Sequence, residues 1–228
     1  PGTAAVADIN NDGANEVIIG AAVFDNVGTL LWESTVGDGF SAVANFNSSP
    51  EPEIVVATNR SLALLDASGN TIWSANNFGG GEVASRPVIG NFDLDPEPEI
   101  LVTIDRRLLL FEPTGEVKWE IDYTDIATDD PNPFASAGAF DLNGDGVLEA
   151  LYQDRRSFKI YDGITGTELF QYAHTADPRY GIITVADIDR DGHGEVLLPA
   201  TGRYFEDDGL GSALFTGTYQ RGIVVLED

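Results

Sequence analysis

The sequence has no cysteine and few basic residues, and both shortages narrow the functions open to it. Without Cys, its 228 residues can form no disulfide, no thiolate nucleophile and no Cys-based zinc site. Lys and Arg number 12 against 38 Asp and Glu, which gives a net charge of -26. Nucleic acids and anionic membrane surfaces are therefore poor partners, because phosphate contacts require clustered cations. Cations are the natural counterpart of such a charge.

Long apolar runs are also missing. The longest, such as "EILVTI" and "GIVVLED", are far shorter than the roughly 20 residues of a membrane-spanning helix, so no membrane insertion is predicted. The chain has two histidines and lacks a nucleophile elbow, a P-loop and a zinc signature. It is nonetheless 43% hydrophobic, enough to bury a core. The sequence therefore predicts a folded protein that is not an enzyme.

An acidic stretch followed by an apolar run recurs five times along the chain. Its copies begin two residues before Asp8, Asn45, Asn91, Asp141 and Asp187, and the first reads "VADINNDGANEVIIGA". A second element follows each of the first four copies, as in "LLDASGNTIW", and ends on an aromatic residue. These aromatic residues are Trp32, Trp73, Trp119 and Phe170. We expect them to pack between neighbouring repeats as core rather than to bind a ligand.

Each repeat contains four short strand signals and no sustained helical periodicity. In the second repeat they are "FSAVA", "EIVVAT", "SLALLD" and "TIW". Four strands repeating every 40–50 residues or so are typical of the blades of a β-propeller. The sequence thus predicts an all-β fold of four-stranded blades. The predicted repeats cover approximately residues 3–36, 37–78, 86–122, 134–173 and 181–228.

The unit "DINNDGANEVIIG" resembles the FG-GAP/VCBS repeat of integrin-α-type propellers, and hairpins such as "LDASGNTIW" resemble those of PQQ-type propellers. The resemblance covers nearly the whole chain and is closest at Asp8, Asp141 and Asp187. It implies a Ca²⁺ ion held between the first and second strands of a blade. It also implies ligand binding on the opposite face.

The residues of the acidic loop independently favour calcium. Oxygen-bearing residues stand at loop positions 1, 3, 5 and 9, with Gly at position 6, where a left-handed conformation is needed. Hard oxygen ligands without His or Cys side chains at these positions select Ca²⁺ over transition metals. Position 7 would contribute only its backbone carbonyl. The predicted ligands are Asp8, Asn10, Asp12, Ala14 and Glu16; Asp141, Asn143, Asp145, Val147 and Glu149; and Asp187, Asp189, Asp191, His193 and Glu195. The alternative is an ordinary Asp/Asn/Gly turn.

Two copies of the loop have drifted from this pattern. Asn91, Asp93, Asp95 and Glu99 keep the oxygens, but Pro96 replaces the glycine, so this is a weaker candidate. The copy that begins at Asn45 lacks most of the carboxylates, and we expect no metal there.

Most of the basic residues are expected on the face opposite the calcium loops, together with aromatic residues of the long connections. Arg60, Arg106, Arg155, Tyr123 and Tyr180 are the candidate ligand-binding residues there. Such a face suits a carboxylate-bearing glycan or an acidic side chain. Local salt bridges with neighbouring acids, such as Asp105 and Asp154, are the alternative explanation.

These observations predict a secreted or cell-surface module, stabilised by Ca²⁺, that binds a protein or a glycan. A lyase-like, polysaccharide-active domain and a structural spacer are the alternatives, the first by analogy of fold alone. The fifth repeat shows three strand signals rather than four. We therefore expect the chain to be part of a longer propeller, of about seven blades on the usual range of such folds.

Overall fold

The computed structural model describes residues 4–76, 78, 84–123, 136–154, 157–173, 183–186, 194–202, 205–207, 213–215 and 220–226. All regular secondary structure within these ranges is β-strand, and they contain no helix that could cross a membrane. The all-β fold predicted from the sequence is confirmed. The chain divides into two compact units, Pro1–Pro133 and Phe134–Asp228.

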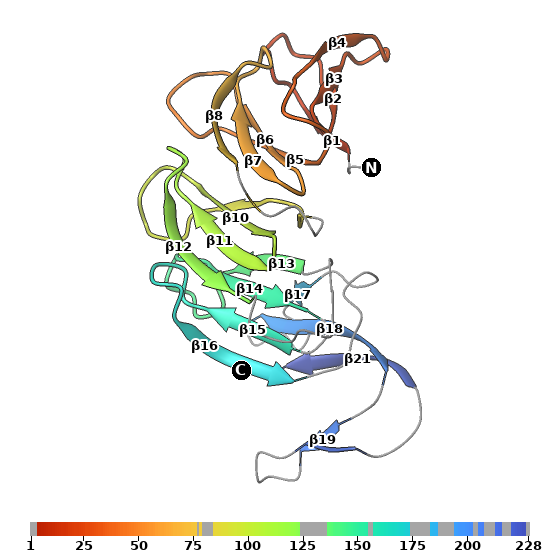
Figure 1. Ribbon diagram of the computed structural model, residues 1–228, viewed down its shortest axis with the longest axis vertical. Helices are drawn as coiled ribbons and strands as arrows, with labels where there is room; N and C mark the ends of the chain where they lie inside the picture. The colour runs from red at the N-terminus through yellow and green to blue at the C-terminus, as the bar shows by residue number, and fades with distance from the viewer. Residues whose placement is uncertain are drawn as a thin grey trace. The chain divides into compact units, whose positions relative to one another are not determined.

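The first unit contains three four-stranded antiparallel sheets, in which neighbouring strands are also consecutive in the sequence (Figure 1). The first sheet comprises β1 (Ala4–Ala7), β2 (Glu16–Ile19), β3 (Ala22–Phe24) and β4 (Leu30–Glu33). The second comprises β5 (Phe40–Ala44), β6 (Glu53–Ala57), β7 (Ser61–Leu65) and β8 (Thr71–Asn76). The third comprises β9 (Val88–Gly90), β10 (Glu99–Ile104), β11 (Arg107–Phe111) and β12 (Val117–Asp122).

The second unit begins with a fourth sheet of the same order. Its strands are β13 (Ser136–Phe140), β14 (Glu149–Gln153), β15 (Ser157–Tyr161) and β16 (Glu168–Ala173). A three-stranded sheet follows, formed by β17 (Thr184–Ala186), β18 (Glu195–Gly202) and β21 (Gln220–Leu226). The hairpin β19 (Phe205–Asp207) and β20 (Ala213–Phe215) is inserted between β18 and β21.

The core of the first unit lies between successive sheets. Ile18 and Val23 of the first sheet pack against Ile54 and Leu65 of the second. The other face of the second sheet packs against the third, so every residue of β6 and β7 is buried. Because both faces of these strands are buried, their sequences are continuous apolar runs. A strand with one face in solvent would instead alternate polar and apolar residues.

Within the first unit, a tryptophan on the fourth strand joins the first sheet to the second and the second sheet to the third. The indole Nε1 of Trp32 donates to the carbonyl of Ala67 at 3.0 Å, and that of Trp73 donates to the carbonyl of Pro113 at 2.8 Å. Both acceptors lie in the turn between the third and fourth strands of the following sheet. The predicted packing of Trp32 and Trp73 between repeats is confirmed, and Trp119 is 9% exposed. Phe170, on the fourth strand of its sheet, is 40% exposed, so its assignment to the core was wrong.

Candidate metal centre

The acidic loops connect the first and second strands of the sheets, and a buried glutamate closes each fully described loop. Loop position 9 holds Glu16, Glu53, Glu99 and Glu149, each at most 5% exposed. In every case Oε2 accepts the backbone N–H of the residue at loop position 2, at 3.0, 2.8, 2.6 and 2.7 Å respectively. The glutamate therefore fixes the loop whether or not a metal is bound, a role that was not predicted from the sequence.

Left-handed backbone conformations shape the loops at two positions. The glycines predicted at position 6, Gly13 and Gly146, have φ of 89° and 91°. Position 4 is left-handed as well, with φ of 57° at Asn11, 74° at Leu94 and 73° at Gly144. Asn and Gly adopt this conformation readily, whereas Leu does so at a cost of about 1–2 kcal/mol. The third loop is therefore strained at Leu94.

In the first loop, the predicted ligands organise the backbone. The carboxylate of Asp8 accepts the N–H groups of Asp12 at 3.1 Å and Gly13 at 2.9 Å. Asn10 accepts the N–H of Asp12, and Asp12 accepts that of Ala14. The predicted side-chain ligands thus line one loop, but most of their oxygens accept hydrogen bonds from the backbone. These ligands are Asp8, Asn10, Asp12 and Glu16.

The fourth loop repeats this pattern. Asp141 accepts the N–H groups of Gly144, Asp145 and Gly146, and Asp145 accepts that of Val147. Asn143 donates its amide to Oε1 of Glu149 at 3.0 Å. Burial raises the pKa of Glu149, and the charges of Asp145 and Asp141 add to this, against a hydrogen bond from Leu142. The loop therefore carries unbalanced negative charge.

The fifth loop can be placed only at its end. Glu195 is 4% exposed, like the glutamates at position 9 elsewhere. Asp187, Asp189, Asp191 and His193 lie outside the described residues, and their role as ligands stays a prediction.

The second loop, expected to be metal-free, satisfies its buried glutamate with neutral donors. Oε1 of Glu53 accepts the amide of Asn47 at 2.5 Å and the hydroxyl of Ser49 at 3.2 Å. Oε2 accepts the N–H of Phe46. Both carboxylate oxygens are thus hydrogen-bonded without a cation.

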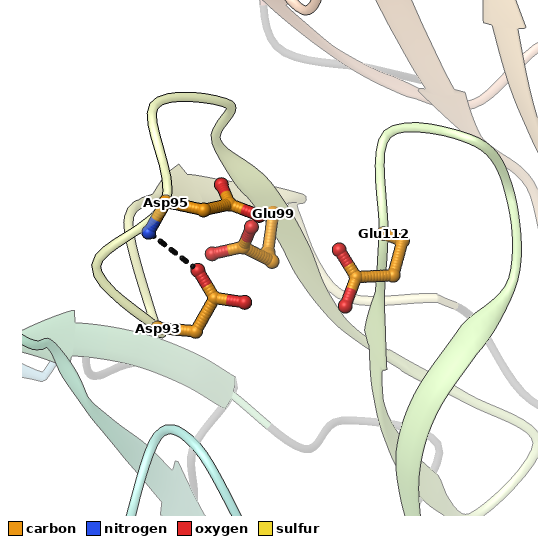
Figure 2. Close-up of side chains that lie close together, drawn as sticks. All are labelled: Asp93, Asp95, Glu99 and Glu112. Carbon is orange, nitrogen blue, oxygen red and sulfur yellow. Dashed lines mark hydrogen bonds between the residues drawn. The ribbon is translucent and has the colours of Figure 1, made fainter.

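At the third loop, four carboxylates gather around a buried oxygen (Figure 2). Asp93, Asp95, Glu99 and Glu112 each offer an oxygen, and these oxygens lie within 4.8 Å of one another. Within the described part of the chain, such a gathering occurs here and not at the first or fourth loop. Oε1 of Glu99 is buried and has no hydrogen-bond partner, and Glu99 itself is 0% exposed. A buried, unpaired carboxylate oxygen among carboxylates is a position that a cation would stabilise.

The members of this cluster differ from the predicted set. Asn91 uses its Oδ1 to accept the N–H groups of Asp93 and Leu94, so it serves the backbone instead. Glu112 takes its place, entering from the turn between β11 and β12, a different hairpin from that of the loop (Figure 2). Glu112 could not be predicted as part of this cluster from the sequence, because only the pairing of β10 with β11 brings it beside the loop.

A lysine from the next strand partly neutralises the cluster. The ammonium of Lys118 contacts Oδ2 of Asp93 and, at 2.7 Å, Oε1 of Glu112. Burial opposes the charged form of Lys118, but these hydrogen bonds and charges prevail and raise its pKa. Burial likewise opposes the charged form of Asp93, yet the Lys118 hydrogen bond keeps the Asp93 pKa below its ordinary value.

Glu99 receives no such compensation. Burial, with the charges of Asp93, Asp95 and Glu112, raises its pKa to about 7 against one backbone hydrogen bond. One lysine faces four acids, so the cluster keeps a net negative charge. Its oxygen-only chemistry fits Ca²⁺, and Asp93, Asp95, Glu99 and Glu112 are the residues that would hold it.

Two of the candidate ligand-binding arginines, Arg60 and Arg106, lie in turns between the second and third strands of their sheets. Arg60 is exposed. Arg106 is half-buried, with φ of 61°, and its carbonyl accepts the N–H of Tyr123 at 2.8 Å. Tyr123 is only 7% exposed, so little of its ring is open to a ligand. Nearby, Arg107 forms a salt bridge with Glu120 at 3.3 Å. Arg155 and Tyr180 lie outside the described residues.

The sequence matches no protein-family model and no curated protein. Solved structures do resemble the chain. The Vibrio cholerae biofilm matrix protein Bap1 aligns with 88% of this chain and 60% of its own, at a TM-score of 0.65 and 15% identity. The rhamnogalacturonan lyase YesW aligns with 87% of this chain and 33% of its own, at a TM-score of 0.54 and 18% identity. The chain thus shares its fold with part of each protein and spans less than two thirds of either.

Proposed function

We propose that the four-stranded sheets are blades of a β-propeller whose acidic loops bind Ca²⁺. In this proposal the chain is an extracellular recognition module for a protein or a glycan. The observation that carries the calcium assignment is the buried Oε1 of Glu99, which has no hydrogen-bond partner and faces three further carboxylates. The sequence pattern supports sites at the first, fourth and fifth loops, and the first and fourth differ from the third in presenting their acids to the backbone.

At the third loop, a lysine would compete with the calcium ion. Its four carboxylates outnumber those of the first loop, but Lys118 already contacts two of them. A calcium ion would have to displace the ammonium or bind beside it, at Glu99 and Asp95. We therefore expect calcium at this loop to be weaker than the number of acids alone would indicate.

The recognition role rests on the fold and on charge. Bap1 is a biofilm matrix protein, and a fold shared with part of it supports a secreted or surface location and a protein or glycan partner. Stabilisation by Ca²⁺ suits that environment, since extracellular modules bind it at about 0.1–1 mM. The exposed Arg60 is available for an acidic ligand, whereas Tyr123 is too buried to contribute more than an edge.

A polysaccharide lyase is the second candidate, favoured by the fold shared with part of YesW. A lyase needs a base to abstract a proton. Among the described lysines, Lys118 is the candidate for that base, because it lies among the proposed metal ligands. Its carboxylate partners raise its pKa, which keeps it protonated and unfit for that task. This observation argues against Lys118 as the base of such a reaction.

Binding to an array of acidic and neutral glycans, in millimolar Ca²⁺ and in EDTA, tests the proposal. We expect calcium-dependent retention of a subset of acidic glycans and no release of unsaturated products from them. Product release would favour the lyase, and the absence of binding in either condition would leave a protein partner or a spacer as the function.

A further inference from the structure

The residue at loop position 3 differs between the second and third loops, and so does the state of the buried glutamate. In the second loop, the amide of Asn47 donates to Oε1 of Glu53 at 2.5 Å, beside a second donor, the hydroxyl of Ser49. In the third loop, Asp93 stands at position 3, and Oε1 of Glu99 has no partner. An amide at position 3 therefore satisfies an oxygen that is left unpaired where a carboxylate takes its place.

The fourth loop depends on one such amide. The Nδ2 of Asn143 donates to Oε1 of Glu149 at 3.0 Å. Position 5 holds Asp145, whose carboxylate cannot add the second donor that the second loop has in its serine. Glu149 is 5% exposed, so water has little access to replace a donor that is lost. The chemical state of Asn143 therefore determines whether Glu149 is satisfied.

Asn143 is followed by Gly144, and no other asparagine in the sequence is followed by glycine. Asparagine loses its amide group when the backbone nitrogen of the next residue attacks its side-chain carbonyl carbon. Glycine at that next position favours the attack, because it has no side chain in the way and its backbone is permissive. The attack forms a cyclic succinimide and expels ammonia, and water then opens the ring to aspartate or isoaspartate. Water is thus the one co-reactant, and nothing is oxidised or reduced.

The folded loop exposes this pair of residues but restrains it. Asn143 and Gly144 are both exposed, so solvent reaches them. The nitrogen of Gly144 donates to Oδ1 of Asp141 at 2.8 Å. Oδ1 of Asn143 accepts the N–H of Asp145 at 2.9 Å, and its Nδ2 is bonded to Glu149. The reaction therefore requires these bonds to open, which in an exposed loop costs less free energy than global unfolding.

We propose that Asn143 is a deamidation site, and that its conversion changes the fourth loop from one that satisfies its own glutamate to one that requires a cation at neutral pH and above. The product places a carboxylate at position 3, as in the third loop, against Oε1 of Glu149. Isoaspartate, the other product, also lengthens the backbone and disrupts the turn. The requirement for a cation rests on the proposed calcium binding, whereas the modification and the loss of the donor do not.

Incubation of the whole chain at mildly alkaline pH, followed by peptide mass spectrometry, tests the modification. We expect Asn143 to be converted faster than the other asparagines of the folded chain, with release of ammonia. Conversion of Asn143 no faster than that of the other asparagines would overturn the proposal.

Gly144→Asn is the control for this reaction. The first loop has Asn11 at the same position with φ of 57°, and nothing lies within 4 Å of a Cβ at Gly144, so the loop should accept the change. The new side chain hinders the attacking nitrogen, and conversion of Asn143 should slow severalfold. Equally fast conversion in this variant would contradict the proposed reaction.

Asn143→Asp reproduces the aspartate product by substitution and measures its consequence. In EDTA at pH 8, its urea unfolding midpoint should be lower than that of the parent, because Glu149 loses its donor and faces a new charge. Asn47→Asp in the second loop should lower the midpoint less, since Ser49 still donates to Glu53. A midpoint of Asn143→Asp equal to that of the parent would overturn the loss of the donor.

Calcium separates this proposal from the proposed function. Millimolar Ca²⁺ should raise the unfolding midpoint of Asn143→Asp more than that of the parent. If calcium raises both midpoints equally, conversion does not make the fourth loop depend on a cation, and that part of the proposal is wrong. If calcium raises neither, calcium binding and the dependence on a cation both fail, whereas the modification is decided by the mass spectrometry alone.

Discussion

The second and third loops share two anchoring features but differ in the charge around their buried glutamate. Both carry proline at position 6 and a buried glutamate at position 9 that accepts a backbone N–H. In the second loop, Asn47 and Ser49 satisfy the other oxygen of Glu53. In the third loop, the corresponding oxygen of Glu99 has no partner and faces Asp93, Asp95 and Glu112.

The difference shows two ways to close the same loop without repulsion. Neutral amide and hydroxyl donors let the second loop hold its glutamate with no metal. The third loop replaces those donors with acids, so the missing compensation has to come from a cation or, below about pH 7, from a proton on Glu99. Lys118 supplies part of it from within the chain, and we infer that Ca²⁺ supplies the rest.

The largest expected effect is on pH dependence, through Glu99. Its ordinary pKa of 4.5 applies to the unfolded chain, and its folded pKa is about 7. As the pH rises from 4.5 to about 7, Glu99 loses its proton in the unfolded state before it does so in the folded state. The free energy of unfolding therefore falls over this range and stays lower above pH 7. Across this pH window in EDTA, the free energy of unfolding of the parent should fall by about 2–3 kcal/mol more than that of Glu99→Gln. Urea unfolding at a series of pH values measures it.

Glu53→Gln is the matched control for that experiment. Its amide group would face the donors Asn47 and Ser49, so this variant should be about 1 kcal/mol less stable than the parent. At pH 8, Glu99→Gln should instead be more stable than the parent. If the two glutamine variants shift stability in the same direction, the two loops do not differ as described.

A somewhat smaller effect is expected at Lys118. Lys118→Met leaves Asp93 and Glu112 facing each other without their shared cation, and should cost about 2 kcal/mol in EDTA. Calcium should restore part of that loss, since the ammonium no longer competes with it. Lys159→Met provides the comparison, because Lys159 pairs with Glu168 at 2.7 Å outside any acidic loop. That variant should lose about 1 kcal/mol or less, equally with and without calcium.

The smallest effect concerns the backbone of the third loop. Leu94 is left-handed and 65% exposed, where the first and fourth loops have Asn11 and Gly144. Leu94→Asn should raise the free energy of unfolding by about 0.5–1 kcal/mol, because asparagine tolerates this conformation. Leu94→Ala, which keeps the penalty of a Cβ, should gain little. If the two variants are equally stable in thermal or urea unfolding, the backbone of the third loop is not strained at Leu94.

Repetition made the fold largely predictable. The alternation of acidic loops and apolar runs placed the four strands of each of the first four sheets, and the spacing of Trp32 and Trp73 anticipated packing between sheets. Gly13 and Gly146 at position 6 were predicted to be left-handed and are so, whereas Gly192 lies outside the described residues. Local signals of this kind depend only on neighbouring residues, which a sequence displays directly.

The candidate site was less predictable, because its decisive contacts join separate hairpins. Glu112 and Lys118 lie well beyond the third loop in the sequence and reach it only through the pairing of β10, β11 and β12. The proline at position 6 ranked the third loop below the first and fourth, whereas the structure gathers the carboxylates at the third. The sequence also does not show which carboxylate oxygens accept backbone N–H groups, as those of Asp8 and Asp141 do.

The most direct test of calcium binding is thermal unfolding in EDTA and in millimolar Ca²⁺, for the parent, Asp145→Ala and Asn47→Ala. Each occupied site should add about 0.4–1.4 kcal/mol at calcium concentrations of one to ten times its dissociation constant. The parent should therefore melt at a clearly higher temperature in calcium. Asp145→Ala should show a smaller rise, and Asn47→Ala, in the loop that satisfies its own glutamate, should show the same rise as the parent. A parent melting temperature that does not respond to calcium would contradict the metal assignment at every loop.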